Sequence, residues 1–136
     1  MMDSKPVILY ADDDPDDREM LREYLLSRNN EFEVVEVANG REALLYLRST
    51  KGLKNPPVLV VLDLNMPILT GRETLAIMKS EQETEKLPVV VFTTSASAHD
   101  EAFCKKFGVT MVTKPQTLEE VKAAVDILLS FIPAAA

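Results

Sequence analysis

An almost unbroken apolar run that ends on a single carboxylate, from Val58 to Asp63, constrains the fold of this chain more than any other segment. Val stands at three of its positions. A short continuous apolar run of this kind is typical of a strand that is covered on both faces of a parallel sheet. Pro67 then stops regular structure. Ligands of open α/β sheets bind at the carboxyl ends of the strands, so Asp63 is predicted to lie at the functional edge.

Strand-like and helix-like segments alternate along the rest of the chain. The predicted strands cover residues 7–11, 32–37, 58–63, 89–94 and 109–113. A helix-start signal follows each of them, and the capping residues are Asp14, Asn39, Thr70, Ser97 and Thr117. Alternation of this kind predicts a doubly wound α/β fold, in which a five-stranded parallel sheet carries helices on both faces.

Local patterns set the expected ends and buried faces of these segments. Pro15 favours a helix start after Asp14, because proline has no N–H group to leave unsatisfied in the first turn. Gly108 is expected to end the fourth helix, and residues 49–57 are expected to form a polar loop before the central strand. The buried stripe of the last helix is expected to contain Leu118, Val121, Val125, Leu128, Leu129 and Ile132.

Length and charge limit the class of protein and its partners. We expect residues 1–136 to form a single domain, with a core at about 7–132 and no output domain after it. The net charge of −7 argues against nucleic acid as a partner, because a phosphate backbone requires a basic face. No apolar run approaches the roughly 20 residues that span a membrane, and the N-terminus lacks the apolar region of a signal peptide. With a single cysteine, Cys104, these features predict a cytoplasmic location.

Side chains that suit phosphoryl chemistry end or follow four of the predicted strands. They are Asp12, Asp13, Asp63, Thr93 and Lys114. Because parallel strands present their carboxyl ends at one edge, we expect these side chains to converge. Carboxylates that share a pocket repel one another, and Mg²⁺ together with an ammonium group relieves that repulsion. Such a set can bind a phosphoryl group while an aspartate attacks it in line.

The motifs at these strand ends resemble those of the receiver domain of two-component response regulators. The resemblance covers about residues 7–132 and rests on Asp12-Asp13, Asp63-Leu-Asn-Met-Pro67, Gly71, Thr93 and Lys114-Pro115. It implies a flavodoxin-like sheet with the strand order 2-1-3-4-5. The polar loop before the central strand is similar to that of stand-alone regulators that are paired with phytochrome-like kinases.

The resemblance also implies how the phosphoryl group and the metal are held. Asp63 is expected to accept a phosphoryl group from a histidine kinase or a histidine phosphotransfer protein. Mg²⁺ is expected to be held by Asp13 and Asp63, by Asp12 partly through water, and by the backbone carbonyl of Asn65. The protein is thus expected to be a signalling protein and not an enzyme.

The same family pattern implies how phosphorylation is sensed. Lys114 is expected to pair with the phosphoryl oxygens, and Thr93 is expected to swing in and bond the phosphoryl group. The peptide bond before Pro115 is expected to be cis, as X–Pro bonds permit. Family members usually carry an aromatic residue three positions before the lysine, where this chain has Met111. A methionine can fill that space but offers no hydroxyl group.

A receiver without an output domain is expected to signal through protein contacts. Its partner is then a downstream protein target, or a histidine phosphotransfer protein that takes the phosphoryl group onward. The expected signalling surface is formed by the fourth predicted helix, the fifth strand and the last helix. The protein is expected to be a monomer or a phosphorylation-dependent dimer.

Three other interpretations use the same residues. An EF-hand-like calcium loop that begins at Asp12 is disfavoured, because its sixth position requires glycine and holds Asp17. A haloacid-dehalogenase-type phosphatase would attack through Asp63, but Asn65 stands where that reaction needs an acid and cannot transfer a proton. A receiver-like binding module that is never phosphorylated is the remaining alternative.

Several polar residues near these motifs are interpreted structurally. Asp14, Asp16 and Asp17 are interpreted as carboxylates that the helix dipole favours at a helix start. His99 is expected on the surface, and Ser95 is expected near the mouth of the pocket. Cys104 is expected to be a small packed residue.

Overall fold

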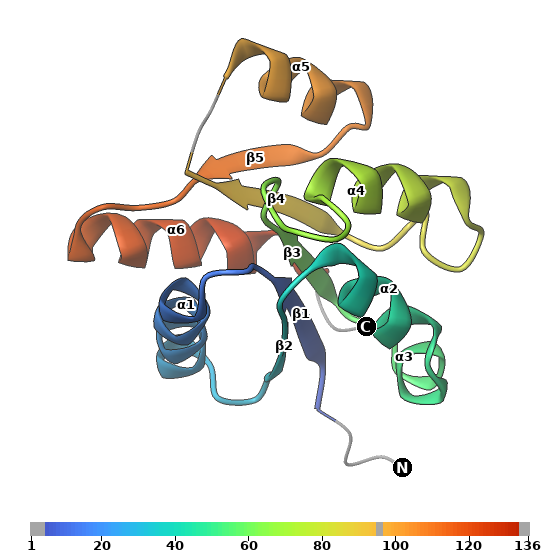
Figure 1. The fold of residues 1–136 in the computed structure, drawn as a ribbon. Helices are drawn as coiled ribbons and strands as arrows, with labels where there is room; N and C mark the ends of the chain where they lie inside the picture. The colour runs from blue at the N-terminus through green and yellow to red at the C-terminus, as the bar shows by residue number, and fades with distance from the viewer. Residues whose placement is uncertain (1–4, 95–96, 134–136) are drawn as a thin grey trace.

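The central sheet contains five parallel strands in the order β2-β1-β3-β4-β5 within residues 5–94 and 97–133, the part of the chain that the computed structural model describes. The strands are β1 (Val7–Ala11), β2 (Glu33–Val37), β3 (Leu59–Leu62), β4 (Val89–Thr93) and β5 (Thr110–Thr113). Each agrees with a predicted strand to within one residue at either end. The predicted fold class and strand order are therefore confirmed (Figure 1).

Helices cover both faces of this sheet (Figure 1). In the described residues they are α1 (Pro15–Arg28), α2 (Gly40–Arg48), α3 (Thr50–Lys54), α4 (Gly71–Ser80), α5 (Ala98–Lys106) and α6 (Leu118–Ser130). α1 and α6 lie side by side over one face, and α2 and α4 cover the other. α5 packs against the edge strand β5. No helix in these residues is both long and apolar enough to cross a bilayer.

The central strands are buried on both faces, which explains their continuous apolar sequences. Along β1, Ile8 and Tyr10 pack into the core cluster under α1 and α6, while Leu9 and Ala11 pack into the cluster under α2 and α4. Successive side chains of a strand point to opposite faces, so both clusters need apolar residues from the same strand. The residues that follow these strands are therefore attached to backbone that the core holds in place.

Side-chain caps begin the helices where the sequence predicts them. Asp14 Oδ1 accepts hydrogen bonds from the backbone N–H groups of Asp16 and Asp17 at the start of α1. A capping box begins α4 at Thr70. Gly108 follows α5 with a φ of +69°, a conformation that glycine adopts without strain. These contacts satisfy backbone groups that the helix ends leave free.

Two expectations about the helices are wrong. Residues 50–54 form α3 and not a loop, because Ser49 Oγ accepts a hydrogen bond from Gly52 N at 3.0 Å and so caps a helical turn. This makes six helices in the described residues in place of the expected five. Leu118 is 55% exposed and not buried, since α6 meets the core only from Val121 onward.

Candidate functional site

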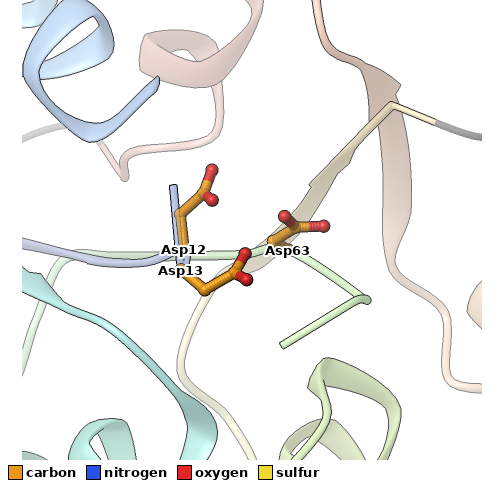
Figure 2. A group of neighbouring side chains, drawn as sticks. All are labelled: Asp12, Asp13 and Asp63. Atoms are coloured by element: carbon orange, nitrogen blue, oxygen red, sulfur yellow. The ribbon is translucent and has the colours of Figure 1, made fainter. Parts of the chain in front are cut away.

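Three carboxylates meet beyond the ends of β1 and β3 (Figure 2). Asp12 and Asp13 directly follow β1, and Asp63 directly follows β3. One oxygen from each of these carboxylates lies within 4.8 Å of the others. Asp12 and Asp63 are buried, whereas Asp13 is exposed. The group therefore combines two buried charges with one side that is open to solvent.

The donor set of this group fits a hard divalent cation. Mg²⁺ takes oxygen ligands, binds through one or two carboxylates and keeps several waters, which the exposed Asp13 side can admit. A bound cation would also neutralise Asp12 and Asp63, whose burial as anions is costly. The softer candidate ligands His99 and Cys104 both belong to α5, where His99 is exposed and Cys104 is buried, as predicted.

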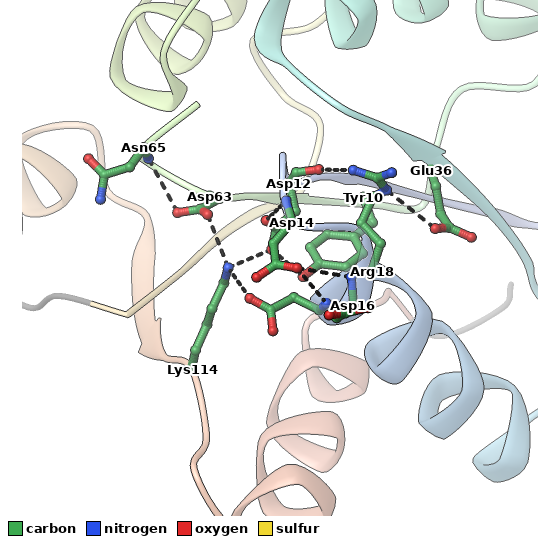
Figure 3. Close-up of polar contacts among 10 residues, drawn as sticks. Tyr10, Asp12, Asp14, Asp16, Arg18, Glu36, Asp63, Asn65 and Lys114 are labelled. Atoms are coloured by element: carbon green, nitrogen blue, oxygen red, sulfur yellow. Dashed lines mark hydrogen bonds and ion pairs between the residues drawn. The ribbon is translucent and has the colours of Figure 1, made fainter. Parts of the chain in front are cut away.

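Lys114 contacts the two buried carboxylates, Asp12 and Asp63 (Figure 3), and links them to a fourth one, Asp17. It directly follows β5, and its side chain is only 8% exposed. Its Nζ lies 2.6 Å from Asp12 Oδ2, 3.0 Å from Asp63 Oδ2 and 2.9 Å from Asp17 Oδ2. A lysine ammonium carries three N–H donors, which these contacts match. Lys114 therefore neutralises part of the negative charge of the site.

Burial and charge act in opposite directions on the ionisable groups here. Burial disfavours the Lys114 ammonium, but its carboxylate partners Asp12, Asp17 and Asp63 outweigh burial and raise the pKa of Lys114 above its ordinary value. Burial also raises the pKa of Asp63, and the ammonium of Lys114 offsets only part of that rise. Lys114 is therefore held in its charged form, and the Asp63 carboxylate is less stable as an anion than in water.

Thr93 brings a hydroxyl group to the same edge. It is the last residue of β4 and is fully buried. Its carbonyl oxygen accepts a hydrogen bond from the backbone N–H of Lys114 at 2.8 Å, which ties the ends of β4 and β5 together. In the described part of the chain Thr93 Oγ1 has no hydrogen-bond partner. A buried hydroxyl without a partner costs about 1–3 kcal/mol, so this group is available to a ligand. Ser95 lies outside the described residues.

Tyr10 is a site residue that the sequence reasoning missed. It lies on β1, and its buried hydroxyl donates a hydrogen bond to Asp12 Oδ2 at 2.6 Å (Figure 3). Burial raises the pKa of Tyr10, and the charge of Asp12 raises it further, so the phenol stays protonated as a donor. The signal was present in the sequence: residues two apart on a strand share a face, which places Tyr10 beside Asp12.

Asp17 is the second missed site residue. Its interpretation as a structural carboxylate at a helix start is incomplete, because its Oδ2 contacts Lys114 Nζ across the site. The two residues are 97 positions apart, so the contact depends on the start of α1 and the residue after β5 meeting at the same edge of the sheet. No local sequence pattern indicates it.

Two expectations about the sensing residues can be compared with the structure. The Lys114–Pro115 peptide is trans, so the expected cis bond is wrong. Trans is the intrinsically favoured form by about 0.5–1 kcal/mol, and Lys114 reaches all of its carboxylate partners with it. Met111 is half-buried on β5 and packs against the small cluster of Leu64, Val91 and Cys104. It thus fills space beside β4 without a polar group.

Comparison with known protein families agrees with this geometry. The family model described as the response regulator receiver domain matches residues 8–126. Response regulator Rcp1 of Synechocystis sp. is 31% identical over 128 residues, which cover 92% of this chain and 87% of the relative. The family match contains all of the site residues, from Tyr10 to Lys114.

Solved structures resemble this one over nearly their whole length. The phosphorylated cyanobacterial phytochrome response regulator RcpA superposes with a TM-score of 0.85 at 32% identity and covers 95% of this chain and 94% of its own. The Mn²⁺-bound form of response regulator Rcp1 gives a TM-score of 0.82 at 30% identity and covers 95% of this chain and 99% of its own.

Proposed function

This chain belongs to the response regulator receiver domain family, and we propose that it receives a phosphoryl group on Asp63 in a two-component pathway. The donor is a histidine kinase or a histidine phosphotransfer protein. The observation that carries the proposal is the convergence on one sheet edge of the Asp63 carboxylate, the Lys114 ammonium 3.0 Å from it and the unpartnered buried hydroxyl of Thr93. RcpA, a relative of similar fold, is known in a phosphorylated form.

The chemistry needs few groups. A carboxylate oxygen of Asp63 bonds to the phosphorus of a phosphohistidine, and the phosphorus–nitrogen bond breaks with its electron pair left on the imidazole. Lys114 Nζ, already at Asp63, donates to the phosphoryl oxygens and neutralises part of their charge. The hydroxyl of Thr93 gains in the phosphorylated protein the hydrogen-bond partner that it lacks here.

Asp12, Asp13 and Asp63 are the residues that would hold Mg²⁺, together with the backbone carbonyl of Asn65. When bound, the cation supplies positive charge to the oxygens of the phosphoryl group. The hydrogen bond from Tyr10 and the one from Asp14 N to Asp12 Oδ1 at 3.0 Å fix the orientation of the Asp12 carboxylate. That orientation prepares the buried ligand before the cation arrives.

The output of the protein is a contact with another protein. We propose that residues 1–136 act as a single receiver domain in the cytoplasm, as a signalling protein and not an enzyme. Phosphorylation changes the face formed by α5, β5 and α6, and that face contacts a downstream protein, a phosphotransfer protein or a second copy of the chain. The β4–β5 tie from Thr93 to Lys114 supports this route, because both site residues adjoin that face.

Intact-mass spectrometry after incubation with Mg²⁺ and acetyl phosphate tests the proposal. The wild-type protein is expected to gain one phosphoryl group, and Asp63→Asn is expected to gain none. Chelation of the metal should abolish the gain. A wild-type protein that neither gains mass nor binds beryllofluoride, which needs no phosphodonor, would contradict phosphorylation and support a silent binding module.

A further inference from the structure

Asp17 adds a fourth carboxylate to a site whose metal group uses three. The metal group consists of Asp12, Asp13 and Asp63. Asp17 lies outside that group, and its Oδ2 contacts Lys114 Nζ at 2.9 Å. Removing Asp17 would therefore leave the metal group complete and remove one of the carboxylates that contact the ammonium.

Lys114 Nζ contacts three carboxylates at once. Lys114 Nζ, which carries three N–H donors, donates hydrogen bonds to Asp17 and Asp63 at 2.9 and 3.0 Å and forms an ion pair with Asp12 at 2.6 Å. A phosphoryl oxygen that arrives at Asp63 can use the donor that now faces Asp63. Any further donation to the phosphoryl group requires Lys114 to leave Asp12 or Asp17. Asp17 thus competes with the phosphoryl group for the same ammonium.

The start of α1 fixes the position of Asp17 beside Lys114. It lies in the first turn of α1, and its backbone N–H donates to Asp14 Oδ1. Its side chain is 28% exposed, so water screens it only in part. A fixed anion at this position repels an incoming dianionic group and attracts the cation that should bind it.

We propose that Asp17 is a positioning residue that draws Lys114 toward α1 and so limits the affinity of the site for a phosphoryl group. This inference rests on the proposed function of Asp63. Asp17 touches neither the metal group nor the attacked phosphorus, and it acts through Lys114. It thereby lowers the stability of the phosphorylated state and favours return to the resting state.

Asp16 offers a matched control. It is the neighbouring aspartate in the same first turn, it is exposed, and its backbone N–H donates to the same Asp14 oxygen. Asp16→Asn and Asp17→Asn remove the same charge from the same helix start, so they change the helix-dipole interaction and the net charge equally. The contact with Lys114 is the difference between them.

The experiment measures beryllofluoride affinity at saturating Mg²⁺ from the amide NMR shifts near Asp63. Asp17→Asn is expected to bind beryllofluoride about threefold to tenfold more tightly than the wild type, the effect of one partly screened charge at contact distance. Asp16→Asn is expected to change the affinity less than twofold. Asp17→Ala, which removes the hydrogen-bond acceptor as well as the charge, should move in the same direction as Asp17→Asn.

A second readout does not depend on phosphorylation. The ¹H–¹⁵N signal of the Lys114 side-chain ammonium in the metal-free protein is expected to shift in Asp17→Asn and to stay unchanged in Asp16→Asn. A shifted signal with equal beryllofluoride affinities in the two variants would overturn the inference and leave the proposed function intact. A wild-type protein that binds no beryllofluoride would overturn the proposed function and the inference together.

Discussion

At the scale of single residues, the buried charges of the site are stabilised by hydrogen bonds and ion pairs with their neighbours. Asp12 Oδ2 accepts a hydrogen bond from the Tyr10 hydroxyl and forms an ion pair with Lys114 Nζ, each at 2.6 Å, and Asp12 Oδ1 accepts from Asp14 N. These bonds compensate a carboxylate that is fully buried. Removing one of these donors should therefore destabilise the folded protein, because the Asp12 carboxylate stays buried with fewer partners.

Tyr10→Phe tests this account of Asp12. The phenyl ring keeps the shape of the buried side chain but cannot donate to Asp12, so the free energy of unfolding is expected to fall by about 1.5–3 kcal/mol. Urea denaturation of the metal-free protein at neutral pH measures the change. Tyr24→Phe, at a half-buried position on α1, is the control and should change the unfolding free energy by less than about 0.5 kcal/mol. Equal changes in the two variants would contradict the role of Tyr10.

Ile68 stores strain in the loop between the site and α4. Its φ is +69°, a left-handed value that is rare for a β-branched residue. The backbone N–H of Leu69 donates to the carbonyl oxygen of Pro67 at 2.7 Å, which closes a strained γ-turn centred on Ile68. The side chain is 74% exposed, so its packing offsets little of this strain.

Ile68→Asn is therefore expected to stabilise the protein, because asparagine tolerates positive φ better than isoleucine does. The expected gain in unfolding free energy is on the order of 1 kcal/mol, measured by thermal or urea denaturation. Leu118→Asn is the control, since it makes a similar apolar-to-polar exchange at an exposed position of a regular helix. A loss of stability in Ile68→Asn would show that the isoleucine side chain makes a contribution that outweighs its backbone strain.

At the scale of whole elements, an ion pair joins α4 to α5, next to the face for which we propose a signalling role. Arg72 Nε and Nη2 both donate to Asp100 Oδ1, at 3.0 and 2.5 Å. Asp100 is 3% exposed and lies in the first turn of α5, where its backbone N–H donates to Ser97 Oγ. The hydrogen bonds from Arg72 lower the pKa of Asp100 below its ordinary value. The pair therefore fixes the start of α5 against α4.

The lowered pKa of Asp100 gives this pair a pH dependence. A carboxylate whose pKa is lower in the folded protein contributes stability above its unfolded pKa of 3.8, and that stability is lost as the pH falls through the folded pKa. Asp100→Asn is expected to cost about 1–3 kcal/mol at pH 7 and progressively less below pH 3.8. Urea denaturation across this pH range measures the loss. The exposed neighbour Glu101 provides the control variant Glu101→Gln, and parallel pH profiles in the two variants would contradict the assignment.

At the scale of the whole molecule, the apolar core and the candidate site occupy different parts of the sheet. Two apolar clusters pack against opposite faces of the sheet and hold the central strands in place. The site lies at the carboxyl edge of those strands, and its residues Thr93 and Lys114 lead directly to the edge formed by α5, β5 and α6. A change in the partners of Lys114 is therefore positioned to reach this face even though Met111 replaces an aromatic residue on β5.

Backbone amide NMR spectra of the free and the beryllofluoride-bound protein test this coupling. Amide shifts in residues 110–123 are expected to change on binding, because Lys114 in that segment and Thr93 bonded to it are both expected to gain new partners. Amides in α3, on the far side of the sheet, serve as the internal control. Identical shifts in residues 110–123 in both states would refute the coupling. Asp63→Asn should show no change in either segment.

The sequence alone was sufficient to predict the sheet and the residues that converge at its edge. The apolar run before Asp63 predicted a buried central strand, and the caps at Asp14 and Thr70 predicted where helices begin. These signals are local, because burial on two faces demands apolar residues in sequence and a helix start needs a side-chain acceptor nearby. Parallel connections then bring Asp12, Asp63 and Lys114 to one edge without any further information.

The tertiary structure alone decided which partners these residues take. The contact between Asp17 and Lys114 joins residues 97 positions apart and depends on the start of α1 and the residue after β5 meeting at one edge of the sheet. Local patterns place a residue on an element, but the orientation of one element against another decides which side chains meet.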